Sequence, residues 1–387
     1  MNVLFLTSCF PKSYHSISND VVLNCLINEC KKKNKVFLAT VGIDNKEITN
    51  EKNNFFFLGD FSSYLKKKKI LFLNNEYDFK NTNEISKKIK LSEMNKIILF
   101  WDTWFDLFNF KNSKSKVCTY LAKPRFSNAL SELKKSKVKN FFTNPKLLLN
   151  LVNLMFLKRK HYNNLRGYGR NFNICNIDTS LTNQNNVKCE YLPNTWPDFF
   201  GKEVLRKRKK HFSKKINILA NIGNFQSTGN KIGMNYLNYK ILPNLLKIKK
   251  DLIINLCGKG SLNPELKNLN LDFVKNKGFV DDLDTEILKN QIFLLCNNTG
   301  YHYGGYTRVV YLMSSAGVLV ADKNLRKSMP ELIHEKNCLL SCNHEQMLDN
   351  LIRVINTKEL RLQIGRNARS TYEKKYAPKI ILEKLLS

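Results

Sequence analysis

The chain has 387 residues, which suits two domains of ordinary size, each able to bury its own core. Its 64 Lys and Arg residues against 32 Asp and Glu leave a net charge of +32, which attracts the phosphates of nucleotides, anionic lipids or nucleic acid. A compositional bias toward Lys and Asn on solvated faces explains this charge equally well. The ten cysteines form no C-x-x-C pair, and neither a basic leader nor a membrane-length apolar run is present, so we expect a cytoplasmic protein.

The first half alternates strand-length apolar runs with helical patterns. Val3–Thr7 and Val36–Val41 flank a segment whose apolar positions recur at helical spacing and which Asn19 or Asp20 can cap. This β-α-β order predicts a parallel sheet, and such sheets bind ligands beyond the carboxyl ends of their strands. Later strands are expected at Ile97–Trp101, Lys116–Leu121, Ile174–Ile177 and Lys188–Leu192.

The loops after these strands carry polar side chains at the expected ligand-binding edge. We predict that they line the amino-terminal side of a cleft with Lys12, His15, Asp102, Lys123 and Arg125. Other roles stay open, because an exposed loop histidine is more often idle than catalytic and Asp102 is equally suited to cap the following helix.

The segment Pro145–Arg159 is rich in leucine and ends in the basic run Lys158, Arg159 and Lys160. It is too short to span a bilayer, but an amphipathic helix of this kind can lie in the headgroup plane of an anionic membrane. The alternative, which we favour, is a helix packed against the sheet. The inner face of a membrane is therefore a candidate peripheral location and partner.

A domain boundary is predicted between the two halves. Leu192–Asp198 contains two prolines, and Arg206–Lys215 is mostly Lys and Arg, which we expect to form a solvated connector without core residues. The expected parts are an amino-terminal domain (1–195), a basic linker (196–215), a carboxyl-terminal domain (216–375) and a final helix (376–387).

The second half repeats the β-α-β alternation with loops of glycine and amide residues. The loops around Gly223, Gly258 and Gly304 each follow a strand of one parallel sheet, so they should share an edge and form a cradle for a nucleotide diphosphate. Arg308 adds a cation in the first turn of the helix that begins near Thr307. No Walker lysine motif and no G-x-G-x-x-G occurs, which argues against an ATPase or an ordinary dinucleotide dehydrogenase.

A metal site is not expected. The best candidate set has an order unlike common zinc spacings, and part of it has the pattern of a short buried strand; its members are His334, Cys338, Cys342 and His344.

The whole pattern resembles a GT-B glycosyltransferase, closest to the retaining group called glycosyltransferase family 4. The second half matches almost throughout, whereas the first half matches mainly at its ends. The matching stretches are Met1–Pro11, Leu192–Asn194, Gly223–Phe225 with Asn230, Cys257–Gly260, Gly278–Leu283, Gly304–Gly305 with Gly317–Val320, Pro330–Ile333 with Asn337–Leu340, and Leu360–Arg369.

The resemblance implies an α/β architecture of two Rossmann-like domains facing across a cleft. It implies metal-independent, retaining sugar transfer from a nucleotide-sugar, without a cofactor, to a glycan or lipid-linked acceptor in surface-polysaccharide or glycolipid assembly. The acceptor would lie on the amino-terminal side, with Tyr376–Ser387 returning to that domain. The donor would be surrounded by Gly223, Asn224, Gly258, Lys259, Gly304, Gly305, Thr307 and Arg308, with His302 near the transferred sugar and Arg308 assisting departure of the diphosphate.

The chain departs from the family at the donor carboxylates. Many members carry two glutamates seven residues apart across the glycine loop. Here Leu312, or Tyr311 after a shift of one residue, stands in the place of the second glutamate, and His302–Gly304 stands in the place of the first. The amino-terminal Gly-Gly loop is also replaced, by Lys12–Ser16. Either this chain binds the donor through groups other than these glutamates, or it has lost the transferase activity.

Three other functions stay open. A GT-B nucleotide-binding or regulatory protein without catalysis would explain the missing carboxylates. A sugar-nucleotide epimerase uses the same fold. A nucleic-acid-binding protein would explain the charge, but the Lys residues are dispersed and no recognised reader motif occurs, so we expect no nucleic-acid partner.

Overall fold

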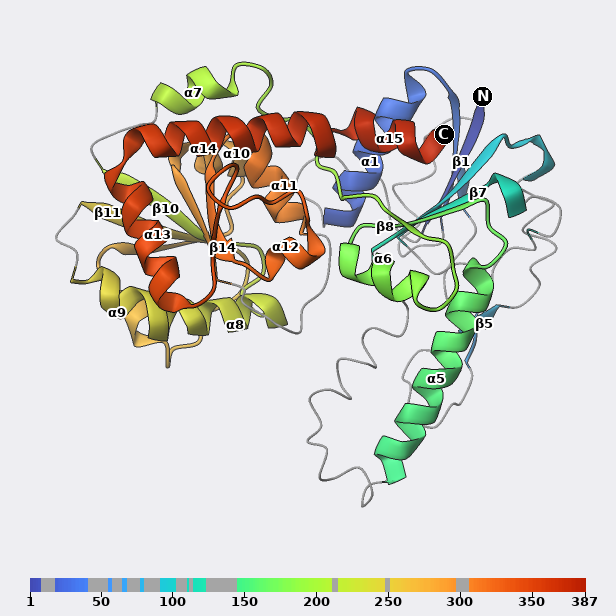
Figure 1. Ribbon diagram of the computed structural model, residues 1–387, viewed down its shortest axis with the longest axis horizontal. Helices are drawn as coiled ribbons and strands as arrows, with labels where there is room; N and C mark the ends of the chain where they lie inside the picture. The colour runs from blue at the N-terminus through green and yellow to red at the C-terminus, as the bar shows by residue number, and fades with distance from the viewer. Residues whose placement is uncertain are drawn as a thin grey trace. The chain divides into compact units, whose positions relative to one another are not determined.

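The computed structural model describes residues 1–7, 18–40, 55–57, 65–67, 77–79, 91–101, 110, 114–122, 145–210, 215–247, 251–296 and 306–387. Contacts divide the chain into two compact units (Figure 1). The first unit comprises Met1–Pro193 with Ile381–Ser387, and the second comprises Asn194–Ile380.

The first unit is built on a seven-stranded sheet in which every paired neighbour is parallel. Its strands, in spatial order, are β3 (Phe55–Phe57), β2 (Lys35–Thr40), β1 (Asn2–Thr7), β6 (Lys96–Phe100), β7 (Val117–Leu121), β8 (Arg170–Asn173) and β9 (Glu190–Tyr191). The chain order reverses between β1 and β6, so the ligand-binding switch point of this sheet lies beyond the carboxyl ends of these two strands. A separate antiparallel pair joins β4 (Leu65–Lys67) to β5 (Tyr77–Phe79).

The helices of the first unit follow the expected alternation with one correction. Among the described residues they are α1 (Ser18–Lys31), α5 (Pro145–Leu165) and α6 (Asn176–Asn183), with 3-10 turns at Leu91–Glu93 and Lys114–Lys116. In α1 the residues Val22, Leu26 and Cys30 are fully buried, as helical spacing of apolar residues requires. The strand expected at Ile174–Ile177 is wrong, because the strand lies earlier, in β8, and α6 begins at Asn176.

The second unit is built on a six-stranded parallel sheet. Its strands, in spatial order, are β12 (Val274–Gly278), β11 (Leu252–Cys257), β10 (Ile216–Ile222), β13 (Ile292–Leu295), β14 (Val318–Asp322) and β15 (Leu339–Ser341). The nearly continuous apolar sequences of β13 and β14 are buried throughout, as expected for strands that are covered on both faces. The doubly wound α/β class predicted from the sequence is confirmed.

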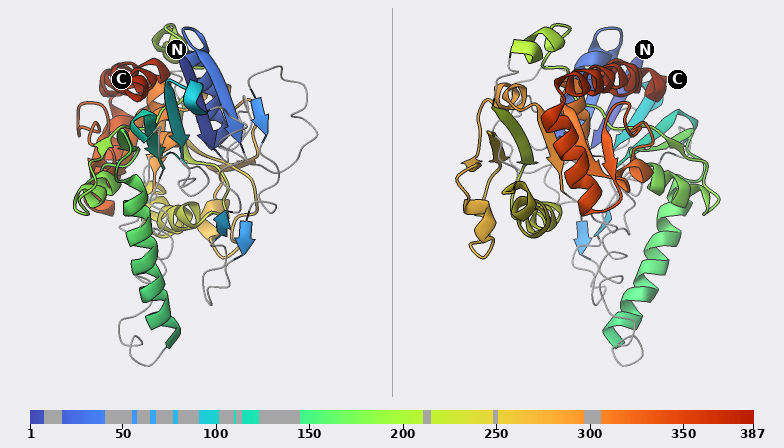
Figure 2. Two further views of the ribbon diagram at one scale, coloured as in Figure 1. Left: turned by 90° about the vertical axis from the view of Figure 1, so that its right-hand side faces the viewer. Right: turned by 60° about the vertical axis from the view of Figure 1, so that its left-hand side comes forward.

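Helices cover both faces of the second sheet (Figure 2). One face packs on α8 (Thr228–Tyr236), its π-helical continuation Leu237–Ile241, α9 (Leu242–Leu245) and α13 (His344–Asn356). The other face packs on α7 (Val204–Lys210), α10 (Leu283–Lys289) and α11 (Thr307–Ser314). The remaining elements are a 3-10 turn at Lys267–Asn270, α12 (Leu325–Ser328), α14 (Lys358–Thr371), a π-helical turn at Tyr372–Tyr376 and α15 (Pro378–Leu386).

The basic connector contributes to the core, contrary to the sequence expectation. Most of its charged side chains in α7 are exposed, but Arg208 is only 3% exposed. Its guanidinium donates to Ser315 O (3.0 Å), to Ser315 Oγ (2.7 Å) and to carbonyls at the end of α10, including Ile287 O (3.2 Å). Burial lowers the pKa of Arg208 to about 9, so it remains a cation at neutral pH. Arg208 thus neutralises the negative ends of two helix dipoles.

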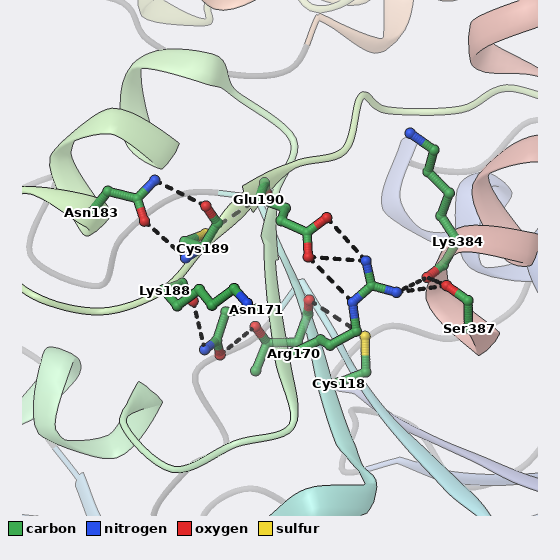
Figure 3. A network of polar contacts seen from close by, with 10 residues as sticks. Cys118, Arg170, Asn171, Asn183, Lys188, Cys189, Glu190, Lys384 and Ser387 are labelled. Atoms are coloured by element: carbon green, nitrogen blue, oxygen red, sulfur yellow. Dashed lines mark hydrogen bonds and ion pairs between the residues drawn. The ribbon is translucent and has the colours of Figure 1, made fainter.

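The last residues of the chain belong to the first unit. Arg170 binds the Glu190 carboxylate through Nη2 (2.9 Å), and its Nη1 donates to Lys384 O (3.3 Å) and Ser387 Oγ (2.6 Å) (Figure 3). The Arg170 guanidinium also lies over the ring of Phe172, 4.7 Å from its centroid. One side chain at the start of β8 therefore joins β9 to the end of α15.

Candidate functional site

The candidate site lies at the carboxyl edge of the second sheet. β10 and β13 are neighbours, and the chain order reverses between them, which makes this the switch point of the sheet. α8 follows β10, and α11 follows β13. Both helices therefore begin at the edge where open parallel sheets bind their ligands.

Neither helix start is capped by the side chain of the residue that precedes it. The residues that precede α8 and α11, Ser227 and Tyr306, make no side-chain capping hydrogen bond. The first N–H groups of a helix have no acceptor within the helix, and the helix dipole adds a partial positive charge there. Two helix N-termini of this kind form a natural phosphate site.

Arg308 connects the two helix starts. Its Nη1 donates to Oδ1 of the buried Asn230 in the first turn of α8, over 2.8 Å. Asn230 Nδ2 donates in turn to Asn224 O, over 2.7 Å. Burial lowers the pKa of the Arg308 guanidinium, an effect that Tyr306 opposes, but arginine stays protonated at neutral pH. In the described part of the chain Arg308 forms no ion pair, so its charge is not neutralised there.

The loops at Gly223 and Gly258 pack directly on one another. Gly223 has a φ of +112°, and a Cβ on Gly258 would lie 1.8 Å from Gly223 O. The N–H of Gly223 donates to Cys257 O (3.0 Å), and that of Gly258 donates to Gly278 O (2.7 Å). Glycine is therefore required at position 258 because the backbones of the two loops are in direct contact. These two amides are used within the sheet, so they are not available to a ligand, whereas the first N–H groups of the two helices are suited to bind one.

We predict that Gly258→Ala destabilises the protein by about 2–3 kcal/mol, because the new methyl group overpacks a backbone contact that cannot relax. Nucleotide binding should weaken as the Gly223 loop moves. The urea midpoint and nucleotide affinity measure the two effects. Gly201→Ala is the control, since no described residue lies within 4 Å of the added Cβ and only backbone strain at a φ of +67° results. Equal effects of the two variants on nucleotide affinity would contradict the assignment of the Gly223 and Gly258 loops to the nucleotide-binding site.

Lys259 adds a second cation at this edge. Its Nζ lies over the ring of Phe279, 4.6 Å from the centroid. Phe279 follows β12, so this contact ties the loop after β11 to the loop after β12. The side chain is exposed, and no carboxylate pairs with it among the residues that the structure describes.

The position of the missing glutamate is occupied by buried side chains. Leu312 is 5% exposed, and Tyr311 is 4% exposed. The Tyr311 hydroxyl donates to Asp284 Oδ1, and its ring lies 5.1 Å from that of Trp196. The Asp284 carboxylate therefore lies beside the position of the missing glutamate, but it belongs to α10 rather than to α11. Sequence analysis missed Asp284; its only signal was the acidic start of α10, where Asp282 caps the helix by accepting from Thr285 N (3.0 Å).

Several predicted site residues lie outside the described residues. They are Lys12, His15, Asp102, Lys123, Arg125, His302, Gly304 and Gly305. Of the expected donor set, the structure brings together Gly223, Asn224, Gly258, Lys259, Thr307 and Arg308 at one sheet edge.

Trp101 is an unpredicted feature of the first unit. It follows β6 directly, at the switch point of the first sheet, and has the left-handed φ of +56° that side chains seldom adopt. Its indole Nε1 is buried and has no hydrogen-bond partner among the described residues. Backbone strain and an unsatisfied donor at such an edge are typical of binding sites.

The described residues contain no group of three or more His, Cys, Asp and Glu side chains placed to hold a metal ion. In the set considered from the sequence, His334 Nδ1 accepts a hydrogen bond from Leu340 N over 3.0 Å. Cys338 is fully buried, with its Sγ near Ile333 O.

Comparison with solved structures matches nearly the whole chain. Sucrose-phosphate synthase of Thermosynechococcus elongatus is 10% identical with a TM-score of 0.65, covering 99% of this chain and 97% of that chain. TarM of S. aureus, solved with fondaparinux, α-GlcNAc-glycerol and UDP, is 12% identical with a TM-score of 0.63, covering 100% and 99%. WaaG, a glycosyltransferase involved in lipopolysaccharide biosynthesis, is 10% identical with a TM-score of 0.58, covering 99% and 98%.

The chain has the GT-B fold. This confirms the fold inferred from the sequence motifs, and the assignment to family 4 within it is approximate. The sequence matches no protein-family model and no curated protein significantly. At 10–13% identity the likeness establishes the GT-B architecture, and function has to be argued from the residues.

Proposed function

We propose that the protein is a nucleotide-sugar-dependent glycosyltransferase. The observation that carries this proposal is the Arg308–Asn230 contact at the switch point of the second sheet. It joins two helix starts whose preceding residues, Ser227 and Tyr306, provide no side-chain cap. Such an arrangement can bind a diphosphate and stabilise its charge as it leaves. The GT-B fold supports the proposal, because the glycosyltransferases that share it include one solved with UDP.

The donor diphosphate is assigned to the helix starts, Thr307, Arg308 and Lys259. These groups supply positive charge where other transferases use a metal ion, so the reaction is proposed to be metal-independent. Asp284, oriented by Tyr311, is proposed to accept hydrogen bonds from donor hydroxyl groups in place of the missing glutamate, since a carboxylate offers several acceptor positions. His302 is proposed to contact the transferred sugar, and the backbone amides of Gly304 and Gly305 are proposed to contribute to the donor diphosphate site. We propose retention of configuration, with the leaving phosphate as the base.

The acceptor is assigned to the first domain, at the carboxyl edge of its sheet. Lys12, His15, Asp102, Lys123 and Arg125 are the proposed polar contacts there. Trp101 joins them, because aromatic rings bind the apolar faces of sugars and its indole N–H can donate to a hydroxyl group. The acceptor is proposed to be a glycan or a lipid-linked sugar in surface-polysaccharide or glycolipid assembly.

Helix α5 offers a surface suited to an anionic membrane. Val152, Met155 and Phe156 share one helix face and are 54%, 65% and 56% exposed. The cations Lys158 and Arg159 follow within one turn, and the first turns of α5 extend beyond the sheet of the first unit (Figure 2). No helix among the described residues is long and apolar enough to cross a bilayer. We propose that the protein acts at the inner membrane face by laying α5 in the headgroup plane.

We expect Phe156→Glu to weaken binding to phosphatidylglycerol vesicles at low salt by about tenfold or more, because it removes an inserted aromatic ring and adds repulsion. Vesicle flotation measures this. Tyr239→Glu in the second unit is the matched control, since Tyr239 is 59% exposed but lies far from α5 in the chain. Vesicle binding that is equally weak in both variants would show an effect of net charge alone and would contradict a role for α5.

A thermal-shift screen against nucleoside diphosphates and nucleotide-sugars tests the donor site. At a concentration of about 100 times Kd, a donor should stabilise the folded state by about 2.7 kcal/mol. Stabilisation by none of them would refute the donor-site assignment. Binding without turnover would instead support a GT-B protein that has lost catalysis, which the buried Leu312 at the glutamate position makes the chief alternative.

A further inference from the structure

A small basic pocket lies in the second unit at the edge of the sheet opposite to the donor site. Its volume is about 100 Å³, and it is lined by Leu205, Arg208, Lys209, Ala316, Arg361, Leu362 and Arg366. Ala316 lies between α11 and the first residue of β14, which places the pocket at the amino ends of the strands. The helix starts at the carboxyl edge are separated from it by the length of the sheet.

The pocket combines four cations with no lining carboxylate. Arg208 and Arg361 are 3% and 6% exposed, whereas Lys209 and Arg366 are exposed. Within the described residues neither Lys209 nor Arg366 forms an ion pair. Glu359, an acid that interacts with Arg361, is exposed and outside the lining. Four like charges around so small a volume repel one another, and a bound anion relieves that repulsion.

The two buried guanidiniums are fixed in place by helix carboxyl ends. Arg208 donates to carbonyls at the ends of α10 and α11, and Arg361 Nη1 donates to Val354 O and to Ile355 O (2.9 Å) at the end of α13. Each helix end offsets only about half an elementary charge, so these carbonyl contacts do not neutralise the cations that line the pocket. The fixed guanidiniums form a preorganised wall, and the exposed cations can close over a ligand.

We propose that this pocket binds a phosphate-sized oxyanion, separately from the donor site. A single tetrahedral phosphate matches both its volume and its charge, and guanidinium groups hold phosphate oxygens through paired hydrogen bonds. Binding would join α7 to α14, because Lys209 and Arg366 come from these two helices. The anion therefore stabilises the attachment of the connector to the second unit.

Calorimetric titration with inorganic phosphate at constant ionic strength tests this proposal. The titration uses the Arg308→Ala protein, so that the donor site at the carboxyl edge of the sheet does not contribute to phosphate binding. We expect the protein to bind one phosphate. Adding Lys209→Gln and Arg366→Gln should weaken the affinity for phosphate roughly tenfold or more, because each substitution removes a charge-assisted contact. The control adds Lys210→Gln and Lys374→Gln, exposed residues outside the pocket, for the same change in charge.

Phosphate binding that survives in the Lys209/Arg366 variant, or that falls equally in the control variant, would overturn the proposal. Absence of binding in the Arg308→Ala protein would overturn it as well. Because both glutamine pairs replace exposed side chains, they should fold, and a urea titration verifies this. These outcomes do not test the proposed transferase activity, whose donor site is tested separately by UDP binding to the unmodified protein.

Discussion

Arg308→Ala is expected to lower kcat/KM for sugar transfer by roughly 100- to 1000-fold, the usual effect of removing one preorganised charge from a developing anion. Arg308 contributes a cation in the first turn of α11 and contacts α8 through Asn230 over 2.8 Å. Its loss therefore removes a charge and loosens the two helix starts. Affinity for a nucleoside diphosphate should fall with activity, which steady-state kinetics and calorimetry measure separately.

Two variants sharpen this experiment. Arg308→Lys keeps the charge but not the planar guanidinium, so it should restore only part of the affinity. Lys231→Ala in α8 removes an exposed cation one residue after Asn230 and should leave kinetics nearly unchanged. Normal diphosphate affinity in Arg308→Ala would contradict the assignment of the donor phosphates to these helix starts.

Arg208→Met is expected to lower the free energy of unfolding by about 3–5 kcal/mol, because it leaves buried acceptors without a donor at the ends of two helices. Ser315 O, Ser315 Oγ and carbonyls of α10 all lose the guanidinium that binds them. The methionine fills the space but satisfies none of these groups. Urea denaturation followed by circular dichroism gives the difference directly.

Arg206→Met is the matched control on the same helix. Arg206 is exposed and pairs with Glu203 over 2.5 Å, so its loss should cost less than about 1 kcal/mol. If Arg208→Met were as stable as Arg206→Met, the carbonyl contacts of Arg208 would contribute little, and α7 would be only a solvated connector as its composition suggests.

The alternation of elements could be predicted from the sequence because it depends on local patterns. Strand-length apolar runs predicted the strands before the glycine loops, which are β10, β11 and β13, and the shared edge of a parallel sheet predicted that the loops around Gly223 and Gly258 converge. The misplaced strand at Ile174–Ile177 shows the limit of this reasoning. A short buried apolar stretch there links β8 to α6, and its pattern does not distinguish a strand from such a link.

The side-chain contacts of the site could not be predicted in the same way. Tyr311 and Asp284 are 27 positions apart and meet only because α10 and α11 pack on the same sheet face. Arg208 lies in a run of exposed cations, and composition gives no sign that one member points inward to helix carboxyl ends. The requirement for glycine at position 258 comes from its contact with the Gly223 loop, and the sequence of either loop alone does not predict that contact.

The most direct test of the central claim is a transfer assay with nucleotide-sugars labelled in the sugar, in the presence of a chelator and of glycan or lipid-linked acceptors. We predict that nucleoside diphosphate is released in step with labelled acceptor, with unchanged anomeric configuration, and that Arg308→Ala abolishes both. Tight binding of the nucleotide-sugar without any labelled acceptor would contradict a transferase, and conversion of the donor sugar to an isomer without acceptor would identify an epimerase instead.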